Sequence, residues 1–389
     1  MASVLLQDPY HPYAVRFIEL LHDKYGHGAV CFFTDRRTRV CNAAAFPALR
    51  SPLVEAVYDV SLDDLAGFAE RVKQRHAIAG VVPFAEPTVL AAAELSERLG
   101  LGWNDRATVE RFRDKYAFKE HLRAHHPHVR VNGSRLVKTV DDVLPGGVPV
   151  FPRYVLKPND GWGNRDIAYL DASSPRAAVE ALLAGAARPL VMEEYVDGPE
   201  YFVNGQVDAR GDAVVVAVFR YGRTEANGCS VDSETRSVRR SDPAFAVVEA
   251  YARDVVRASG LTRSPFHLEV KVDARGPCLI EAGARLAGNE NAWVCNRLHG
   301  DALDLFDVAA HYYVRTTDYG PMETNWARYD ASSAVYVHGL ASRRGRLRTV
   351  RGIREVEALP TFARWVKKPA VGDRIEPTVS SLTSPGAPC

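Results

Sequence analysis

One short stretch of the sequence, CLIEAGARLAGN at residues 278–289, combines buried chain with two opposite charges. Glu281 ends an apolar run, and Arg285 follows four residues later among Ala and Gly, which are too small to cover either side chain. A guanidinium presents a fork of N–H donors that matches phosphate oxygens. We therefore expect both charges to face a bound phosphate.

A second carboxylate, Glu269 in HLEVKVD, lies twelve positions before Glu281 across a short turn marked by Gly276. On paired strands the two carboxylates can lie side by side, where like charges destabilise the sheet unless a cation separates them. Carboxylates offered alongside substrate phosphates bind Mg²⁺, so the hairpin predicts a Mg²⁺ site, with Mn²⁺ as a substitute. The alternative is that the carboxylates occupy opposite faces or are neutralised by Lys271 and Arg285.

A glycine-rich turn, DGWGN at residues 160–164, follows a strand that ends near Lys157. Its glycines let successive backbone N–H groups converge on an anion, and the lysine adds a positive charge. An ordinary hairpin turn beside a solvated lysine is the alternative, since glycine turns are common. The candidate residues are Lys157, Gly161, Gly163 and Asn164, with Trp162 between the glycines.

Glutamates also surround a turn between two strands in VMEEYVDGPEYFV. Glu193 and Glu194 follow an apolar run, and Glu200 opens the next strand after a Gly-Pro turn. An ionised carboxylate only accepts hydrogen bonds, so it can bind an exocyclic amine or a ribose hydroxyl. The alternative is an exposed strand end, where glutamates are common.

Other polar groups give weaker signals. In NGCSVDSETRSV, Glu234 or Arg236 could pair with a charged group of a substrate, and an ordinary polar strand is equally compatible. Four histidines within residues 121–128 are compatible with a metal site, but no Cys or carboxylate completes the motif. The sequence contains neither a P-loop nor the glycine pattern of dinucleotide-binding proteins.

Composition narrows the class of protein. The 389 residues include 49 Lys and Arg against 48 Asp and Glu, so binding to nucleic acid through bulk charge is not expected. No apolar run approaches the roughly 20 residues that span a bilayer, and the N-terminus does not resemble a secretory signal. The six scattered cysteines indicate neither disulfides nor a zinc knuckle. We expect a cytoplasmic protein that binds no membrane and that is compatible with a homodimer.

The length of the chain predicts several packed units that position these groups. Helix and strand patterns alternate through the first ~100 residues, which predicts a small parallel α/β unit. One helix is expected over residues 106–126, and strands with short turns dominate residues 154–221. A β-rich segment is expected near the end of the chain, after a linker around DYGPMETNW.

Taken together and in this order, the motifs resemble the ATP-grasp superfamily, and more closely its carboxylate-amine ligases, including L-amino-acid ligases and biotin carboxylase. The resemblance covers roughly residues 105–310 and adds Lys115 in FRDKYAFKEHL. It implies an N-terminal Rossmann-like domain, two α+β subdomains that enclose ATP, and a small β-rich C-terminal part. The implied boundaries of these four units are 1–104, 105–187, 188–325 and 326–389.

The resemblance also implies roles by position. Lys115 and Lys157, with the glycine turn, would hold the nucleotide phosphates. Lys157 and Arg285 would act in catalysis, and Arg285 would stabilise the transferred phosphoryl group. The other implied contacts are adenine at Glu193, Glu194, Tyr195 and Val196, ribose at Glu200, and Mg²⁺ at Glu269 and Glu281.

Two positions depart from the family pattern. Many relatives have Asn two residues after the second metal carboxylate, where this chain has Gly283. Trp162 places an indole in a loop that usually holds small residues. We expect these differences to affect the second metal ion, the substrate and loop closure more than the nucleotide site.

The implied activity is that of an ATP-dependent ligase. A carboxylate substrate would attack the γ-phosphate of MgATP, and an amine would then displace phosphate to give an amide and ADP. Amino acids or small peptides are the implied substrates. The alternatives are an ATP-grasp kinase that phosphorylates a hydroxyl and a nucleotide-binding protein without activity.

Overall fold

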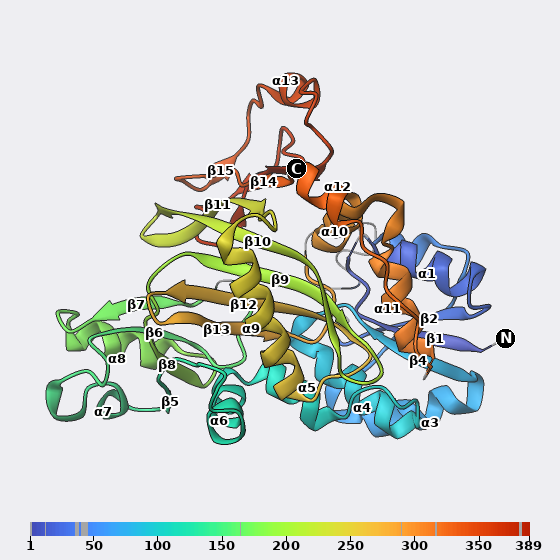
Figure 1. Cartoon of the computed structure of the whole chain (residues 1–389), viewed down its shortest axis with the longest axis horizontal. Helices are drawn as coiled ribbons and strands as arrows, with labels where there is room; N and C mark the ends of the chain where they lie inside the picture. Colours follow the sequence, from blue (N-terminus) through green and yellow to red (C-terminus); the bar gives the residue numbers. More distant parts are fainter. Residues whose placement is uncertain are drawn as a thin grey trace.

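The structure of the protein is a computed structural model. The described residues are 2–11, 13–35, 39, 46–163, 165–288, 290–315, 317–380 and 383–389. Within them the chain forms three sheets of at least four strands and two small sheets of two strands each. The N-terminal sheet and the four-stranded antiparallel sheet lie at opposite ends of the molecule, with the six-stranded sheet between them (Figure 1).

The N-terminal sheet is parallel, with the strand order β3-β2-β1-β4. Its elements are β1 (Ser3–Gln7), α1 (Ala14–Asp23), β2 (Gly28–Phe33), β3 (Val54–Asp59), α3 (Leu65–Arg75), β4 (Ile78–Pro83) and α4 (Val89–Leu99). β1 and β2 are buried at every residue, as expected for parallel strands covered on both faces. The expected α/β unit is therefore observed, with β1 and β3 in addition to the strands that the sequence pattern indicated.

The prediction of a single helix over residues 106–126 is wrong. The structure has two helices there, α5 (Arg106–Arg113) and α6 (Lys115–His125). Asp114 between them is extended (φ −99°, ψ 98°), and its side chain caps α6 by accepting a backbone N–H at 2.7 Å. Residues two apart on a continuous helix do not share a face. The break therefore allows Arg113 and Lys115 to reach the same loop.

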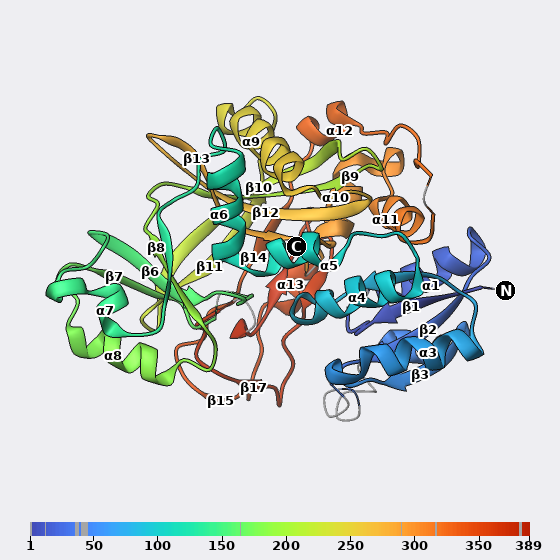
Figure 2. The same ribbon diagram turned by 90° about the horizontal axis from the view of Figure 1, so that it is seen from below.

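A four-stranded antiparallel sheet follows, with the order β5-β8-β6-β7. Its elements are β5 (Ser134–Val137), α7 (Val140–Val143), β6 (Arg153–Pro158), β7 (Ala168–Asp171), α8 (Arg176–Gly185) and β8 (Leu190–Glu194). It has a small core of its own, which includes Tyr154, Val179 and Met192. This sheet with α7 and α8 forms the end of the molecule opposite the N-terminal unit (Figure 2).

The largest sheet has six strands in the order β13-β12-β9-β10-β11-β14. The elements of this region are β9 (Glu200–Val207), β10 (Ala213–Ala226), β11 (Cys229–Ser237), α9 (Pro243–Ser259), β12 (Ser264–Asp273), β13 (Gly276–Gly283), α10 (Asn291–His299) and α11 (Leu305–Val314). α9 begins at the Asp242 cap and ends at Gly260, a left-handed residue (φ 76°), as the sequence predicts. The predicted β12–β13 hairpin is present.

The C-terminal part is rich in short strands, as expected, but it does not form an independent large sheet. Its elements are α12 (Trp326–Ala331), β14 (Val335–Val337), β15 (Gly345–Arg346), α13 (Ile353–Glu357), β16 (Trp365–Lys367), β17 (Arg374–Ile375) and β18 (Ala387–Pro388). β14 pairs with β11 and so extends the six-stranded sheet. The remaining strands form two small pairs, β15 with β17 and β16 with β18.

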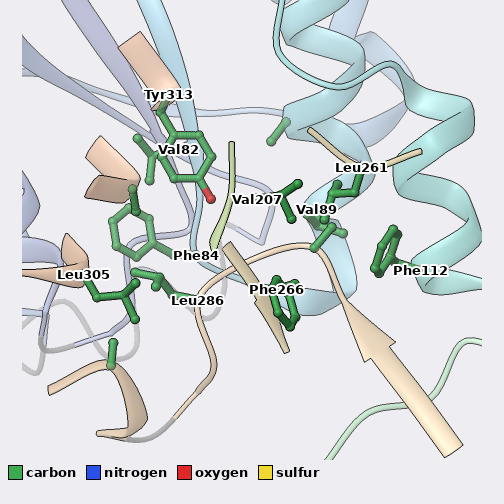
Figure 3. Packing of buried hydrophobic residues seen from close by; sticks show 14 of the residues in the cluster. Val82, Phe84, Val89, Phe112, Val207, Leu261, Phe266, Leu286, Leu305 and Tyr313 are labelled. Atoms are coloured by element: carbon green, nitrogen blue, oxygen red, sulfur yellow. The ribbon is translucent and has the colours of Figure 1, made fainter. Parts of the chain in front are cut away.

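One hydrophobic core joins the N-terminal unit to the six-stranded sheet. Phe84, at the end of β4, belongs to the same cluster as Phe266 of β12 and Leu286 after β13 (Figure 3). A shared core fixes the relative position of the two parts more firmly than polar contacts would. None of the helices in the described ranges has both the length and the apolar content that crossing a membrane requires.

The cap at Asp114 can be tested by substitution. Asp114→Ala removes the side-chain acceptor at the start of α6, so we expect the free energy of unfolding to fall by about 1 kcal/mol. Asp114→Asn keeps an acceptor and should stay within about 0.5 kcal/mol of the native protein. Chemical denaturation measures both variants. Equal losses in the two variants would contradict the capping role.

Candidate active site

A cavity of about 560 Å³ is lined by residues of both antiparallel sheets and of the C-terminal part. The predicted site residues that line it are Lys115, Lys157, Gly161, Trp162, Gly163, Glu193, Glu194, Tyr195, Val196, Glu200, Glu269, Glu281 and Arg285. Asn164, which the sequence analysis assigned to the glycine turn, lies outside the described residues. The fold thus brings together groups that are up to 170 positions apart, from Lys115 to Arg285.

Two carboxylates lie next to each other in the wall of this cavity. Glu269 and Glu281 are direct partners in the register of β12 and β13, and a register shift follows immediately after Glu269. Both side chains line the cavity, so they share one side of the sheet. Of the two arrangements that the sequence left open, the structure has the adjacent one.

Burial disfavours the ionised form of both carboxylates. It raises the pKa of Glu281, where Lys115 opposes the shift and Glu269 adds to it. In Glu269 the neighbouring His267 and Arg223, together with the Tyr221 hydroxyl that donates to Oε1 at 2.9 Å, outweigh burial and lower the pKa. The pair is thus a site of like charge that a divalent cation would stabilise.

The donor set is compatible with Mg²⁺. Within the described ranges no group of three or more His, Cys, Asp or Glu side chains gathers in a metal-binding arrangement. Mg²⁺ does not need one, because it keeps several waters and is usually held by one or two carboxylates together with substrate phosphates. Glu269 and Glu281, next to open space in the cavity, meet that requirement.

A buried triad of charges from α6, β6 and β8 lies at the cavity, which two of its members, Lys157 and Glu193, line. Glu193 Oε2 lies 2.6 Å from Lys119 Nζ and 3.0 Å from Lys157 Nζ, and the three side chains are almost completely buried. Lys119 was not among the residues predicted from the sequence. The sequence feature that could have identified Lys119 is its spacing from Lys115, because residues four apart share one face of a helix.

The surroundings of the triad favour the ionised carboxylate and two protonated lysines at neutral pH. Burial lowers the pKa of Lys119 to about 8, although Glu193 opposes that shift. Burial also disfavours ionised Glu193, but the two lysines outweigh it and lower the pKa of Glu193 to about 2. One carboxylate between two lysines leaves a positive charge, which favours an anionic ligand. Glu193 Oε1 is buried without a hydrogen-bond partner among the described residues and can accept one from an exocyclic amine.

The chain after β8 is held firmly where the adenine contacts were expected. The Tyr195 ring contacts two cations, with Arg153 Cζ at 4.1 Å and Lys271 Nζ at 4.6 Å from the ring centroid. Lys271 also donates to the carbonyl of Val196 at 3.1 Å. Glu194 pairs with Arg275 at 3.0 Å near the surface. This segment therefore offers a rigid edge to the cavity.

Glu200 belongs to a second buried cluster that the sequence analysis missed. Arg223 lies 2.8 Å from Glu200 Oε1 and 2.8 Å from Asp232 Oδ1, bridging β9, β10 and β11. Burial raises the pKa of Asp232 to about 6, although Arg223 opposes the shift. Arg223 and Asp232 are partners in the register of β10 and β11, next to a bulge in β11 at Ser233. No local motif signals such a pair.

The structure does not bring Glu234 and Arg236 to the cavity. These two side chains pair with each other at 2.5 Å near the surface. Their strand neighbours Asp232 and Thr235 line the cavity instead. Ser233 is an extra residue in β11, a bulge that shifts the alternation of side chains along this strand, so a simple count selects the wrong residues.

Arg285 has a protein partner that the sequence analysis did not anticipate. Its Nε lies 2.5 Å from Oε2 of Glu86, which follows β4 of the N-terminal sheet. Glu86 Oε1 accepts a hydrogen bond from Arg113 Nη1 at 2.9 Å, and both side chains are about 5% exposed. The signal for Glu86 was its place after a parallel strand, since ligands of α/β sheets bind near the carboxyl ends of strands.

The glycine turn is held by cations from the α5–α6 break. Lys115 Nζ donates to the carbonyl of Gly161 at 2.8 Å, and Arg113 donates to the carbonyl of Asp160. The Trp162 ring has Arg188 at 4.5 Å and Arg113 at 5.9 Å from its centroid. The turn therefore packs over the cavity rather than extending into solvent.

Comparison with protein families identifies residues 154–292 as an ATP-grasp domain. The chain is 27% identical over 325 residues to the uncharacterized protein y4rH of Sinorhizobium fredii, a match that covers 80% of this chain and 63% of that protein. It is 29% identical over 153 residues to the dapdiamide A synthase of Enterobacter agglomerans, or 38% of this chain and 36% of the synthase. The chain therefore spans less than two thirds of the length of these relatives.

Solved structures share the fold over the whole chain. The L-amino acid ligase from Bacillus licheniformis has a TM-score of 0.79 at 18% identity, covering 100% of this chain and 92% of the ligase. The biotin carboxylase domain of the 2-oxoglutarate carboxylase from Hydrogenobacter thermophilus, in complex with MgADP, has a TM-score of 0.67 at 13% identity, covering 100% and 86%. At these identities the likeness concerns the fold, and it confirms the fold class predicted from the sequence.

The buried triad gives a prediction about stability. Glu193→Gln leaves Lys119 and Lys157 buried without a counter-charge, so we expect a loss on the order of 3–5 kcal/mol in the free energy of unfolding. Glu194→Gln is the matched control, because its partner Arg275 is exposed and such pairs contribute roughly 0–1 kcal/mol. Denaturation at pH 7 measures both, and similar losses would contradict the role of the triad.

The same triad predicts the direction of a pH effect. The pKa of Glu193 falls from its usual 4.5 to about 2 on folding, so its ionised form stabilises the native state above pH 4.5. That contribution should disappear as the pH falls from 4.5 towards 2. In Glu193→Gln the corresponding part of the acid dependence should be absent.

Proposed function

We propose, from the premise that this chain belongs to the ATP-grasp superfamily, that it is an ATP-dependent carboxylate-amine ligase. The observation that carries the proposal is the adjacent pair Glu269 and Glu281, in one cavity with Lys115, Lys157 and Arg285. Two carboxylates beside several cations suit a phosphate ligand with its metal ion. The names of the relatives support amino acids or small peptides as the substrates.

The nucleotide would bind between the two antiparallel sheets. Lys115 and Lys157, which line the cavity, would contact its phosphates, and the N–H groups of the glycine turn would cover them. Glu193 Oε1 and the segment at Tyr195 are available to the adenine, and Glu200 to the ribose. The positive charge that remains on the Lys119–Glu193–Lys157 triad favours this anionic ligand.

The reaction has two steps. A carboxylate oxygen of the first substrate attacks the γ-phosphorus, and the bond to the β-phosphate oxygen breaks to release ADP. The amine nitrogen of the second substrate then attacks the acyl carbon, phosphate leaves with the bonding electron pair, and the nitrogen loses a proton. Atoms and charge balance to give an amide, ADP and phosphate.

The residues of the chain position and stabilise the reactants in this mechanism. Mg²⁺, held by Glu269 and Glu281, would neutralise charge on the phosphates. Arg285 would stabilise the equatorial oxygens of the transferred phosphoryl group, because its planar fork matches charge spread over several atoms. Lys157 is held rigidly by Glu193, so its ammonium group needs little reorganisation as charge develops.

An acylphosphate is electrophilic at carbon, and this property separates a ligase from a kinase. With ATP, Mg²⁺ and mixtures of amino acids, hydroxylamine should trap the intermediate as a hydroxamate, which mass spectrometry detects. Arg285→Lys should lower the rate of hydroxamate formation by about tenfold or more with little change in ATP affinity. A phosphorylated product that is stable to hydroxylamine and forms without any amine would establish a kinase instead.

The carboxylate pair can be tested independently of the acceptor. Glu281→Gln should lower ADP release by at least about 100-fold at saturating Mg²⁺, because the metal loses one of two protein ligands. Glu234→Gln is the control, since Glu234 lies outside the cavity and should keep near-native turnover. Near-native ADP release by Glu281→Gln would refute the metal assignment.

A further inference from the structure

A chain of buried contacts connects the glycine turn to Arg285. Arg113 donates a hydrogen bond to the carbonyl of Asp160 in the turn, and its guanidinium also contacts the ring of Trp162. Its other terminal nitrogen donates to Glu86. Glu86 then contacts Arg285 through its second oxygen. We propose that Glu86 and Arg113 are positioning residues that align Arg285 and couple it to the position of the glycine turn. This inference rests on the proposed function, in which Arg285 stabilises the transferred phosphoryl group.

The contacts of Arg285 indicate that Glu86 holds its side chain in place. Glu86 Oε2 lies 2.5 Å from Arg285 Nε, and this buried ion pair restrains the guanidinium. Arg285 Nη1 donates to the adjacent carbonyl of Leu286 at 2.6 Å, and the side chain still lines the cavity.

The charge balance of the three residues supports the same conclusion. Two guanidiniums share one carboxylate, so the buried group carries one excess positive charge. Burial disfavours ionisation of Glu86, but Arg285 and Arg113 outweigh it and lower its pKa. Glu86 therefore remains a carboxylate, and the excess charge is available to an anion at Arg285.

Gly283 makes room for this arrangement. A Cβ atom at residue 283 would lie 3.1 Å from Glu86 Oε2, closer than an ordinary contact. The backbone there is not left-handed, so no conformational requirement explains the glycine. The glycine thus leaves space for a carboxylate that comes from the N-terminal unit.

The break at Asp114 is the other structural requirement. Arg113, the last residue of α5, contacts Asp160, while Lys115, the first residue of α6, contacts Gly161. In a continuous helix the two cations would point to different sides. The extended Asp114 therefore lets two consecutive carbonyls of the glycine turn accept hydrogen bonds from residues on either side of the break.

A double-mutant cycle tests whether Glu86 acts through Arg285. Turnover is measured as ADP release from MgATP with the amino-acid mixture that supports it best, or as basal ATP hydrolysis if none does. Glu86→Gln should lower kcat about tenfold and leave the KM for ATP within about twofold. In the Arg285→Lys background the same change should lower kcat by no more than about twofold. Equal factors in both backgrounds would overturn the proposal.

A second variant disturbs Glu86 without removing its charge. Gly283→Ala places a methyl group against Glu86 Oε2 and should lower kcat in the same direction as Glu86→Gln, with little effect on the KM for ATP. Gly185→Ala is the matched control, because a Cβ atom there meets nothing within 4 Å and the site lies on α8, outside the cavity. Native kcat in Gly283→Ala would count against the proposal.

The coupling to the glycine turn needs a measurement that does not depend on the acceptor. With MgADP bound, trypsin cleavage after the exposed Arg165 reports how well the turn is held. Arg113→Lys keeps the charge but loses the fork, so cleavage should be at least about threefold faster than in the native protein. Arg111→Lys, on the same helix but bonded to Ser259, should behave as native. An unchanged rate in Arg113→Lys would refute the coupling even if the enzyme proved not to be a ligase.

Discussion

The site depends on the requirement that every buried charge has a partner. Lys119, Lys157 and Glu193 form one compensated group, and Glu200, Arg223 and Asp232 form another. Burying one of these charges alone would be strongly unfavourable, whereas a shared partner makes each group stable. Because each group shares one partner, the Lys119–Glu193–Lys157 group keeps a positive charge and the Glu200–Arg223–Asp232 group keeps a negative one. The same ion pairs that make burial of these charges possible therefore also set the charge of the cavity wall.

Irregularities of the backbone decide which charges can meet. The extended Asp114 separates α5 from α6 and directs two cations to one turn. The shift in register after Glu269 and the bulge at Ser233 determine which side chains of β11 to β13 reach the cavity. In regular helices and strands these groups would point to different faces. The side chains reach one cavity because the backbone is irregular at these positions.

The sequence predicted what local patterns encode. The β12–β13 hairpin follows from a short turn between two apolar strands, and pairing across it placed Glu269 opposite Glu281. Lys119 and Glu86 were missed because their partners are distant in sequence, 74 residues away for Lys119 and Glu193 and 199 for Glu86 and Arg285. Arg223 was missed because its pairing with Glu200 and Asp232 depends on the register of three strands. The helix break was missed because 106–126 has continuous helical periodicity, and a capping Asp inside it resembles any polar surface residue.

The shared core explains why a residue of the N-terminal unit can take part in a site built by two other sheets. Phe84 lies two residues before Glu86, and Leu286 directly follows Arg285; both belong to one buried cluster (Figure 3). Hydrophobic packing of these neighbours fixes the two backbones, and the ion pair then needs only side-chain placement. A polar contact across a mobile interface would lose most of its strength to conformational entropy. The N-terminal unit therefore contributes to the alignment of Arg285 through apolar contacts that touch no ligand.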